Sequence, residues 1–232
     1  MWGLFKQNIA INQIANSSYV LCWSAKWHGK PGMFFDSIHK SKPVVMLQKI
    51  HTMMSRADAI VHYNGTKFDV PTLNKEFIKH EFKPPAPSHQ IDLLLVAKKM
   101  CRFDSNKLDY VSKYLGIGEK VRHEGHELWV KCMEKDNAAW KRMKEYNKND
   151  VILLEKLYKR MLPWIDTHPS HAAFEDYPCC PNCGGEHYQQ QGWRVTRTMK
   201  YPRYACQDCG TWFRGNKSIS PKGERFVGIP AA

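Results

Sequence analysis

The sequence has no apolar run long enough to cross a membrane. No uninterrupted apolar stretch approaches the roughly 20 residues that a transmembrane helix requires. The opening residues, MWGLFKQNIAINQ, also lack the basic start, long apolar stretch and cleavage site of a secretory signal. There is no internal repeat and no low-complexity tract. These absences predict a soluble protein in the cytoplasm with no membrane partner.

Acidic residues are scarce relative to basic ones. The chain has 22 Asp and Glu against 35 Lys and Arg, which gives a net charge of +13 and a pI near 9.4. An excess of this kind favours polyanions, because binding releases their condensed counterions. The apolar share of 43% and the aromatic share of 12% exclude a disordered chain. Nucleic acid is the partner that this composition favours, with mere solubility as the alternative.

The length of 232 residues allows one substantial core and a small appendage. The polar, proline-flanked segment THPSHAAFEDYP separates the two. We therefore predict a larger domain over residues 1–166, a linker over 167–178, a small cysteine-bearing domain over 179–215 and a basic tail over 216–232.

The order of predicted elements favours a layered fold. Alternating apolar residues predict a strand within residues 18–27, and short apolar runs predict strands at 2–11 and 58–62. Helical spacing of apolar residues predicts helices at 44–56, 70–80, 91–101, 107–115, 127–130 and 138–161. Strands precede helices, so we expect an α/β fold in which helices flank a mixed sheet.

One candidate site follows the strand at 58–62. Asn64 and Gly65 signal a turn, and Asp69 opens the helix that contains Pro71 in its first turn. This places a carboxylate at the sheet edge where open α/β sheets bind ligands. The alternatives are ordinary: Asp69 as a helix N-cap and Asn64 as a simple turn residue.

A second candidate site lies on the last helix. Tyr146 and Asp150 are four residues apart, so the phenol and the carboxylate share one helix face. Asp150 could hold a metal there while Tyr146 positions a water molecule. The alternative is an unremarkable side-chain pair on an amphipathic helix.

The two sites together resemble a known family. Asn64-x4-Asp69 after a strand, a largely helical gap of about eighty residues and Tyr146-x3-Asp150 are similar to the DEDDy 3′–5′ exonucleases, which have a ribonuclease H-like fold. The likeness spans residues 2–163 and includes FDSNKLDYVSKYLGI at 103–117. The resemblance implies that Asp69 and Asp150 bind two Mg²⁺ or Mn²⁺ ions, that Tyr146 orients the attacking water and that Asn64 contacts substrate.

The sequence departs from that family in one respect. The family's first motif is Asp-x-Glu on the opening strand, and this chain contains no Asp-x-Glu; Asp36 is followed two positions later by Ile38. Two of four carboxylates would be missing, and two divalent ions about 4 Å apart would then repel with little compensation. We expect an N-terminally truncated domain with little activity unless an upstream segment or a partner chain supplies the motif.

Five of the eight cysteines cluster near the C-terminal end. Cys180 and Cys183, and Cys206 and Cys209, form two C-x-x-C-G pairs separated by 22 residues, slightly beyond the roughly 15–20 usual in a four-cysteine zinc site. Cys179 and His187 are the rival ligands. The sequence predicts a structural Zn²⁺ ribbon, and the clustering favours a reducing compartment.

The predicted ribbon mixes cations with aromatic residues, as binders of single strands do. It resembles zinc ribbons attached to phage and transposon enzymes. The candidate nucleic-acid-binding residues are Trp193, Arg194, Arg197, Arg203, Trp212 and Arg214. An inert or protein-binding ribbon is the alternative.

Three functional hypotheses follow. The first is a phage-like 3′–5′ exonuclease acting on DNA, with single-stranded 3′ ends as substrate and the host cytoplasm as its location if viral. The second is a non-catalytic nucleic-acid-binding protein derived from an exonuclease. The third is a transposase-like enzyme of related fold, which the ribbon suggests and the spacing of Tyr146 and Asp150 disfavours.

Overall fold

The computed structural model describes residues 17–218, which divide into two compact units. The first comprises residues 17–92 and 107–155, and the second comprises residues 93–106 and 156–218. The strand predicted at residues 2–11 and most of the predicted basic tail lie outside the described residues. The domain boundaries predicted from the sequence stay a prediction.

The first unit begins with an antiparallel hairpin. Strand β1 (Cys22–Ala25) pairs with β2 (Phe34–Ser37), with Cys22 opposite Ser37. Within β1 the predicted alternation is confirmed, since Trp23 packs into one apolar cluster and Cys22 borders the other. The strand is shorter than the predicted residues 18–27, and β2 was not predicted. Its FFDS sequence acquires strand structure from the pairing with β1, which is a tertiary effect.

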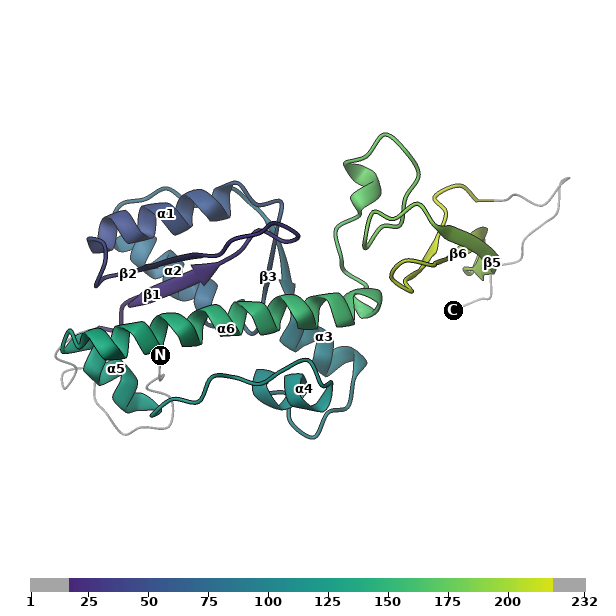
Figure 1. Ribbon diagram of the computed structural model, residues 1–232. Helices are drawn as coiled ribbons and strands as arrows, with labels where there is room; N and C mark the ends of the chain where they lie inside the picture. The colour runs from purple at the N-terminus through teal and green to yellow at the C-terminus, as the bar shows by residue number, and fades with distance from the viewer. Residues whose placement is uncertain (1–16, 219–232) are drawn as a thin grey trace, which may run out of the picture. The chain divides into compact units, whose positions relative to one another are not determined.

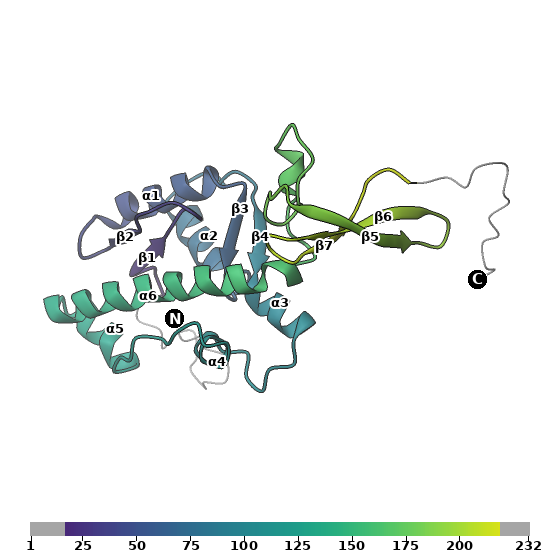
Figure 2. The same cartoon turned by 45° about the vertical axis from the view of Figure 1, so that its right-hand side comes forward.

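Helices cover both faces of this hairpin, with α1 on one side and α6 on the other (Figures 1 and 2). Helix α1 (Pro43–Ser55) starts with proline, which is favourable where no N–H partner is needed. Its apolar face joins Trp23 and Phe77 in one core, and the Trp23 indole donates to the Met46 carbonyl at 3.0 Å. Helix α6 (Asn137–Met161) and α5 (His126–Met133) build the other core around Trp140.

A parallel strand pair positions the first candidate site. Strand β3 (Ala59–His62) pairs with β4 (His89–Asp92), so that His62 lies opposite Asp92. Helix α2 (Asp69–Lys79) forms the crossover that a parallel connection requires. Strand β4 includes the first two residues of the helix predicted at 91–101, so that part of the prediction is wrong. The strand forms by pairing with β3, thirty residues earlier in the chain, and local periodicity does not reveal such a pairing. The first unit also contains α4 (Leu108–Tyr114).

The second unit contains α3 (Leu93–Met100), the end of α6 and a three-stranded antiparallel sheet. Strand β6 (Lys200–Cys206) is central, between β5 (Tyr188–Val195) and β7 (Trp212–Arg214). Short 3₁₀ turns, η2 (Leu162–Trp164) and η3 (His171–Ala173), precede the sheet. The Asn182 amide donates to the Leu162 and Ile165 carbonyls at 2.8 and 3.0 Å, which ties the first cysteine pair to the end of α6. In the described part of the chain, no helix is long and apolar enough to span a membrane.

Candidate active site and cysteine centre

The turn from Asn64 to Asp69 follows directly from the end of β3. Asn64 has a φ of 65°, which asparagine tolerates better than most residues. Its carbonyl accepts from the Lys67 and Phe68 N–H groups at 3.2 Å, and the Gly65 carbonyl accepts from Val70 at 2.9 Å. The backbone is therefore wound tightly before α2 begins, as the Asn-Gly pair predicts.

Two buried side chains at the strand ends hold this turn. The Asn64 N–H donates to Asp92 Oδ1 at 2.8 Å, and the Gly65 N–H donates to His62 Nδ1 at 3.1 Å. On the other side of the ring, His62 Nε2 lies 3.1 Å from Gln90 Oε1. A Cβ on Gly65 would lie 2.5 Å from His62 Cγ, so only glycine fits there. Residues from both parallel strands thus position the backbone ahead of Asp69.

Asp69 does not cap its helix, contrary to the simpler reading of the sequence. The N-cap position of α2 belongs to Phe68, which makes no side-chain capping bond, and the Thr72 N–H bonds to the Phe68 carbonyl. The residue reaches solvent, but partial burial of its carboxyl raises the pKa, reinforced by Asp92 and opposed by His62. A bound cation would therefore stabilise the charged form of this carboxylate.

Tyr146 and Asp150 meet through a third residue. Lys120 Nζ lies 2.8 Å from Asp150 Oδ2 and 3.4 Å from the Tyr146 hydroxyl. Burial alone would lower the pKa of Lys120, but the Asp150 carboxylate outweighs this effect, so the pKa of Lys120 is raised overall. Burial and the nearby charge of Asp150 also raise the pKa of Tyr146. The other oxygen, Asp150 Oδ1, is buried and has no hydrogen-bond partner among the residues that the structure describes. Tyr146 and Asp150 therefore share one face of α6, as their spacing predicts, and Lys120 from the loop before α5 contacts both.

The two groups remain separate in hydrogen bonding. Among residues 17–218, no hydrogen bond or ion pair joins Asp69 to Tyr146 or Asp150. Direct contact is not required, because two-metal sites spread their ligands around ions 3.5–4 Å apart. The orphaned Asp150 Oδ1 and the Asp69 carboxyl suit the oxygen-preferring Mg²⁺ or Mn²⁺. Convergence of these carboxylates on one pair of ions stays a prediction.

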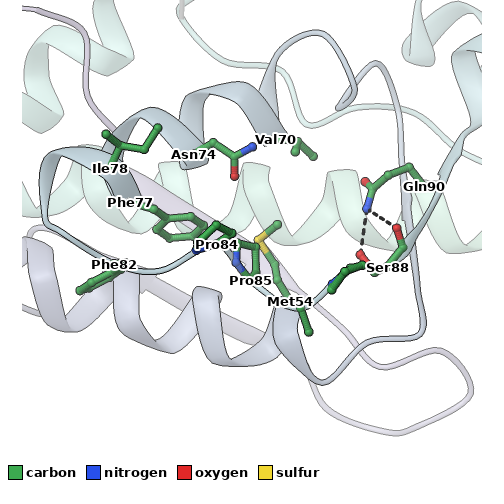
Figure 3. A pocket seen from close by; sticks show the side chains of 12 residues that line it. Met54, Val70, Asn74, Phe77, Ile78, Phe82, Pro84, Pro85, Ser88 and Gln90 are labelled. Atoms are coloured by element: carbon green, nitrogen blue, oxygen red, sulfur yellow. Dashed lines mark hydrogen bonds between the residues drawn. The ribbon is translucent and has the colours of Figure 1, made fainter.

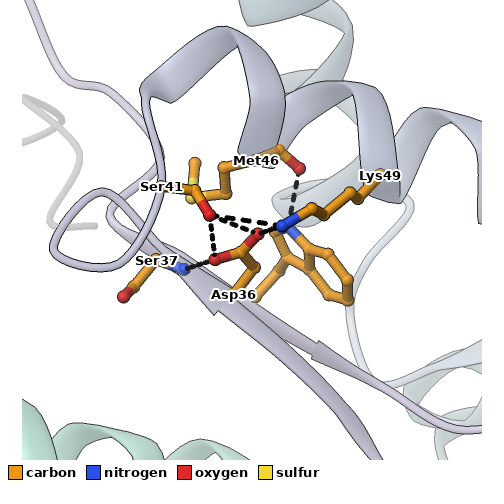
Figure 4. Close-up of polar contacts among 6 residues, drawn as sticks. Asp36, Ser37, Ser41, Met46 and Lys49 are labelled. Atoms are coloured by element: carbon orange, nitrogen blue, oxygen red, sulfur yellow. Dashed lines mark hydrogen bonds and ion pairs between the residues drawn. The ribbon is translucent and has the colours of Figure 1, made fainter.

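Asp36, the first acidic residue of the chain, has a structural role. It is buried at the end of β2, where it accepts from the Ser37 N–H and Ser41 hydroxyl at 2.9 Å and from Lys49 at 2.6 Å (Figure 4). Burial would raise the pKa of Asp36, but these hydrogen bonds lower it. The network ties β2 to α1, which explains the burial of the Asp36 carboxylate without metal chemistry.

An open apolar groove of about 370 Å³ lies along α2 (Figure 3). Met54, Phe77, Phe82 and the proline-rich segment 84–87 line it, with Gln90 hydrogen-bonded to Ser88 at one end. None of its lining residues is titratable. The groove therefore offers no side chain that could act as a general acid or base.

Four cysteines converge in the second unit. The Sγ atoms of Cys180, Cys183, Cys206 and Cys209 all lie within 4.8 Å of one another, and two of the pairs are 3.7 Å apart. This separation fits a tetrahedron with metal–sulfur bonds of about 2.3 Å, as in Zn²⁺ sites. The rival Cys179 is outside the cluster, and the exposed His187 pairs with Asp208 at 3.0 Å. The set therefore suits a tetrahedral metal ion.

The six predicted nucleic-acid-binding residues divide between two faces of the β5–β6–β7 sheet. Arg194 lies opposite Tyr201, Arg203 lies opposite Arg214, and Trp212 lies opposite Ala205, which places all of them on one face. Trp193 lies opposite Pro202 on the other face. Arg197 lies in the turn between β5 and β6.

The profile of the RNase H superfamily matches residues 25–162, more than half of the chain. The chain belongs to the RNase H superfamily. A solved structure of the family B DNA polymerase from the hyperthermophilic archaeon Pyrobaculum calidifontis is similar at 20% identity and a TM-score of 0.47. The match covers 58% of this chain and only 20% of the polymerase chain. No curated protein matches the chain significantly.

Membership of the RNase H superfamily confirms the predicted fold class and supports a nuclease function that uses divalent metals. Sequence reasoning missed His62, Asp92 and Lys120. Asp92 had no usable signal, because it ends the short strand β4, which the local pattern did not reveal. Lys120 had none, since it lies in an irregular loop more than two dozen residues from its partners.

Proposed function

We propose that this chain is a DEDDy-type 3′–5′ exonuclease domain that hydrolyses DNA from single-stranded 3′ ends. The observation that carries the proposal is the grouping of Tyr146, Asp150 and Lys120, with one Asp150 oxygen buried and unpaired. A buried acceptor without a partner costs about 1–3 kcal/mol, and a metal ion bound to this oxygen would remove that cost.

In this proposal Asp69 and Asp150 hold Mg²⁺ or Mn²⁺, which supplies an activated water and stabilises the leaving oxygen. The Tyr146 hydroxyl orients the attacking water, and the raised pKa keeps the phenol protonated at neutral pH. Lys120 fixes the rotamers of both neighbours. Asn64 faces the substrate from the turn that His62 and Asp92 hold.

The 232 residues should have little activity by themselves. They contain no Asp-x-Glu, so the proposed site holds only two of the family's four carboxylates. The four-cysteine centre would hold a structural Zn²⁺. The missing motif also favours a second candidate, a non-catalytic nucleic-acid-binding protein derived from an exonuclease.

The test measures metal binding and hydrolysis separately. Mn²⁺ binding to the zinc-loaded chain is followed by electron paramagnetic resonance, and degradation of 5′-labelled single-stranded DNA is followed on gels. We expect Asp69→Asn and Asp150→Asn to weaken Mn²⁺ binding about tenfold, and Asp166→Asn, at an exposed carboxylate that pairs with Lys99, to leave it unchanged. Unchanged binding in both site variants contradicts the exonuclease site. Rapid hydrolysis at the rate of an intact homologue contradicts the impairment.

A further inference from the structure

Two arginines face each other across neighbouring strands of the three-stranded sheet. Arg203 on β6 lies directly opposite Arg214 on β7, and both are exposed. Like charges in this relationship destabilise a sheet. An anion bound between the two arginines would therefore relieve their electrostatic repulsion.

Each of these arginines is stacked on an aromatic ring. The Arg203 guanidinium lies 4.8 Å from the Trp212 ring centroid, and the Arg214 guanidinium lies 4.1 Å from that of Tyr201. Arg203 also donates from Nε to the Gln191 carbonyl at 3.0 Å. Stacking and this bond reduce the entropy that the side chains lose when a ligand binds.

Within residues 17–218, no carboxylate forms an ion pair with the arginines of this surface, which we name the arginine face and define as Arg194, Tyr201, Arg203, Trp212 and Arg214. Between residues 188 and 207 the sequence has no Asp or Glu. Trp212 exposes 54% of its surface, an unusually wet setting for a tryptophan.

The opposite face is organised differently. Tyr188, Tyr204 and Phe213 pack against one another there, with ring centroids 5.4 to 5.5 Å apart. They form the small apolar core of the sheet. Trp193 and Lys200 pair with each other beyond that core, with the ammonium 4.5 Å from the ring. This face therefore provides a matched control for the first.

We infer that the arginine face binds a single-stranded nucleic acid, with phosphates between Arg203 and Arg214 and an unpaired base stacked on Trp212. Phosphate contacts to guanidinium groups and base stacking on aromatic rings are the two components of single-strand binding. The inference rests on the proposed function in one respect only, that the ligand is a nucleic acid. Trp193 and Arg197, predicted from sequence, lie outside this face.

The test is fluorescence anisotropy of a labelled oligothymidylate with the zinc-loaded full chain, without added Mg²⁺ or Mn²⁺. We expect Trp212→Ala to weaken binding about tenfold and Trp212→Phe to restore most of it. The double variant Arg203→Gln, Arg214→Gln should lower the slope of log affinity against log salt by about 1.4, since each neutralised phosphate contributes about 0.7. On the other face, Trp193→Ala and Lys200→Gln should change affinity less than about twofold. Retained zinc and circular dichroism verify folding.

Three results overturn the inference: no effect of Trp212→Ala, equal effects of variants on both faces, or equally strong competition by blunt duplex DNA or polyglutamate. Polyglutamate competition would indicate an acidic protein as partner. Because the assay contains no catalytic metal, Trp212-dependent binding by a chain that never hydrolyses DNA upholds this inference while the exonuclease proposal fails. Metal-dependent hydrolysis by a chain whose DNA binding does not depend on Trp212 supports the exonuclease proposal and contradicts this inference.

Discussion

Lys120 donates a hydrogen bond to Asp150, with 2.8 Å between Nζ and Oδ2, and it leaves Asp150 Oδ1 buried and unpaired. The ammonium thus satisfies only half of the carboxylate. The pair connects the loop before α5 with the middle of α6. Its partial burial, with side chains 29% and 25% exposed, makes it stronger than a surface ion pair.

Lys120→Met should lower the free energy of unfolding by about 1 kcal/mol in the absence of Mg²⁺ and Mn²⁺. The substitution removes the ammonium that pairs with Asp150, and solvent screening of this partly exposed pair keeps the loss small. Urea denaturation of the zinc-loaded chain measures the effect. Lys113→Met is the control, because Lys113 pairs with Asp109 at 3.0 Å on an exposed surface. Equal losses in the two variants would show that Lys120 is an ordinary surface lysine.

Gly65→Ala should cost about 1–3 kcal/mol, the range for overpacking a filled site. The new methyl group would meet the buried His62 ring at 2.5 Å and force the Asn64–Asp69 turn to shift. Thermal unfolding measures the loss. In Gly29→Ala the methyl group meets nothing within 4 Å, so only its positive φ of 69° adds cost. A Gly65→Ala protein as stable as the Gly29→Ala control contradicts the packing around His62.

Asp36→Asn should destabilise the protein by about 1–3 kcal/mol at pH 7, because it weakens a buried hydrogen-bonded carboxylate. The pKa of Asp36 is lower folded than unfolded, so its stabilisation is present above the unfolded pKa and is lost as pH falls through the folded value. The difference between wild type and variant should therefore shrink below about pH 4.

Urea denaturation at pH 7 and at about pH 3, below the unfolded pKa, measures that change for Asp36. Asp166→Asn is the matched control, because Asp166 pairs with Lys99 on the surface, and it should have a much smaller effect. A difference between Asp36→Asn and wild type that is constant with pH would mean that Asp36 is not ionised in the folded protein.

Cys206→Ser should release zinc from the purified chain and unfold the three-stranded sheet. A structural zinc contributes about 10 kcal/mol of folding free energy, far more than so small a core supplies. Metal analysis by mass spectrometry gives the zinc content per chain. Cys179→Ser should keep its zinc, because Cys179 is buried outside the cluster. If Cys179→Ser lost its zinc instead, Cys179 would have to replace one of the four cysteines as a zinc ligand.

Much of the helical structure could be predicted from local pattern. The predicted helix over 44–56 corresponds to α1 (Pro43–Ser55), and that over 138–161 corresponds to α6 (Asn137–Met161). Both carry long apolar faces, for which the 3.6-residue period is unambiguous. The short strands β2 and β4 were missed, because four residues carry too little periodicity to compete with context.

The sequence by itself determined the chemistry that is local: the Asn-Gly turn before Asp69, the helix face shared by Tyr146 and Asp150, and the two cysteine pairs. Each depends on spacing within a few residues, which backbone geometry converts directly into proximity. Only the tertiary structure decided that Asp92 holds the Asn64 turn, that Lys120 satisfies one oxygen of Asp150 and that Arg203 faces Arg214. Those relationships join segments from different strands and loops, whose pairing depends on packing rather than on any local period.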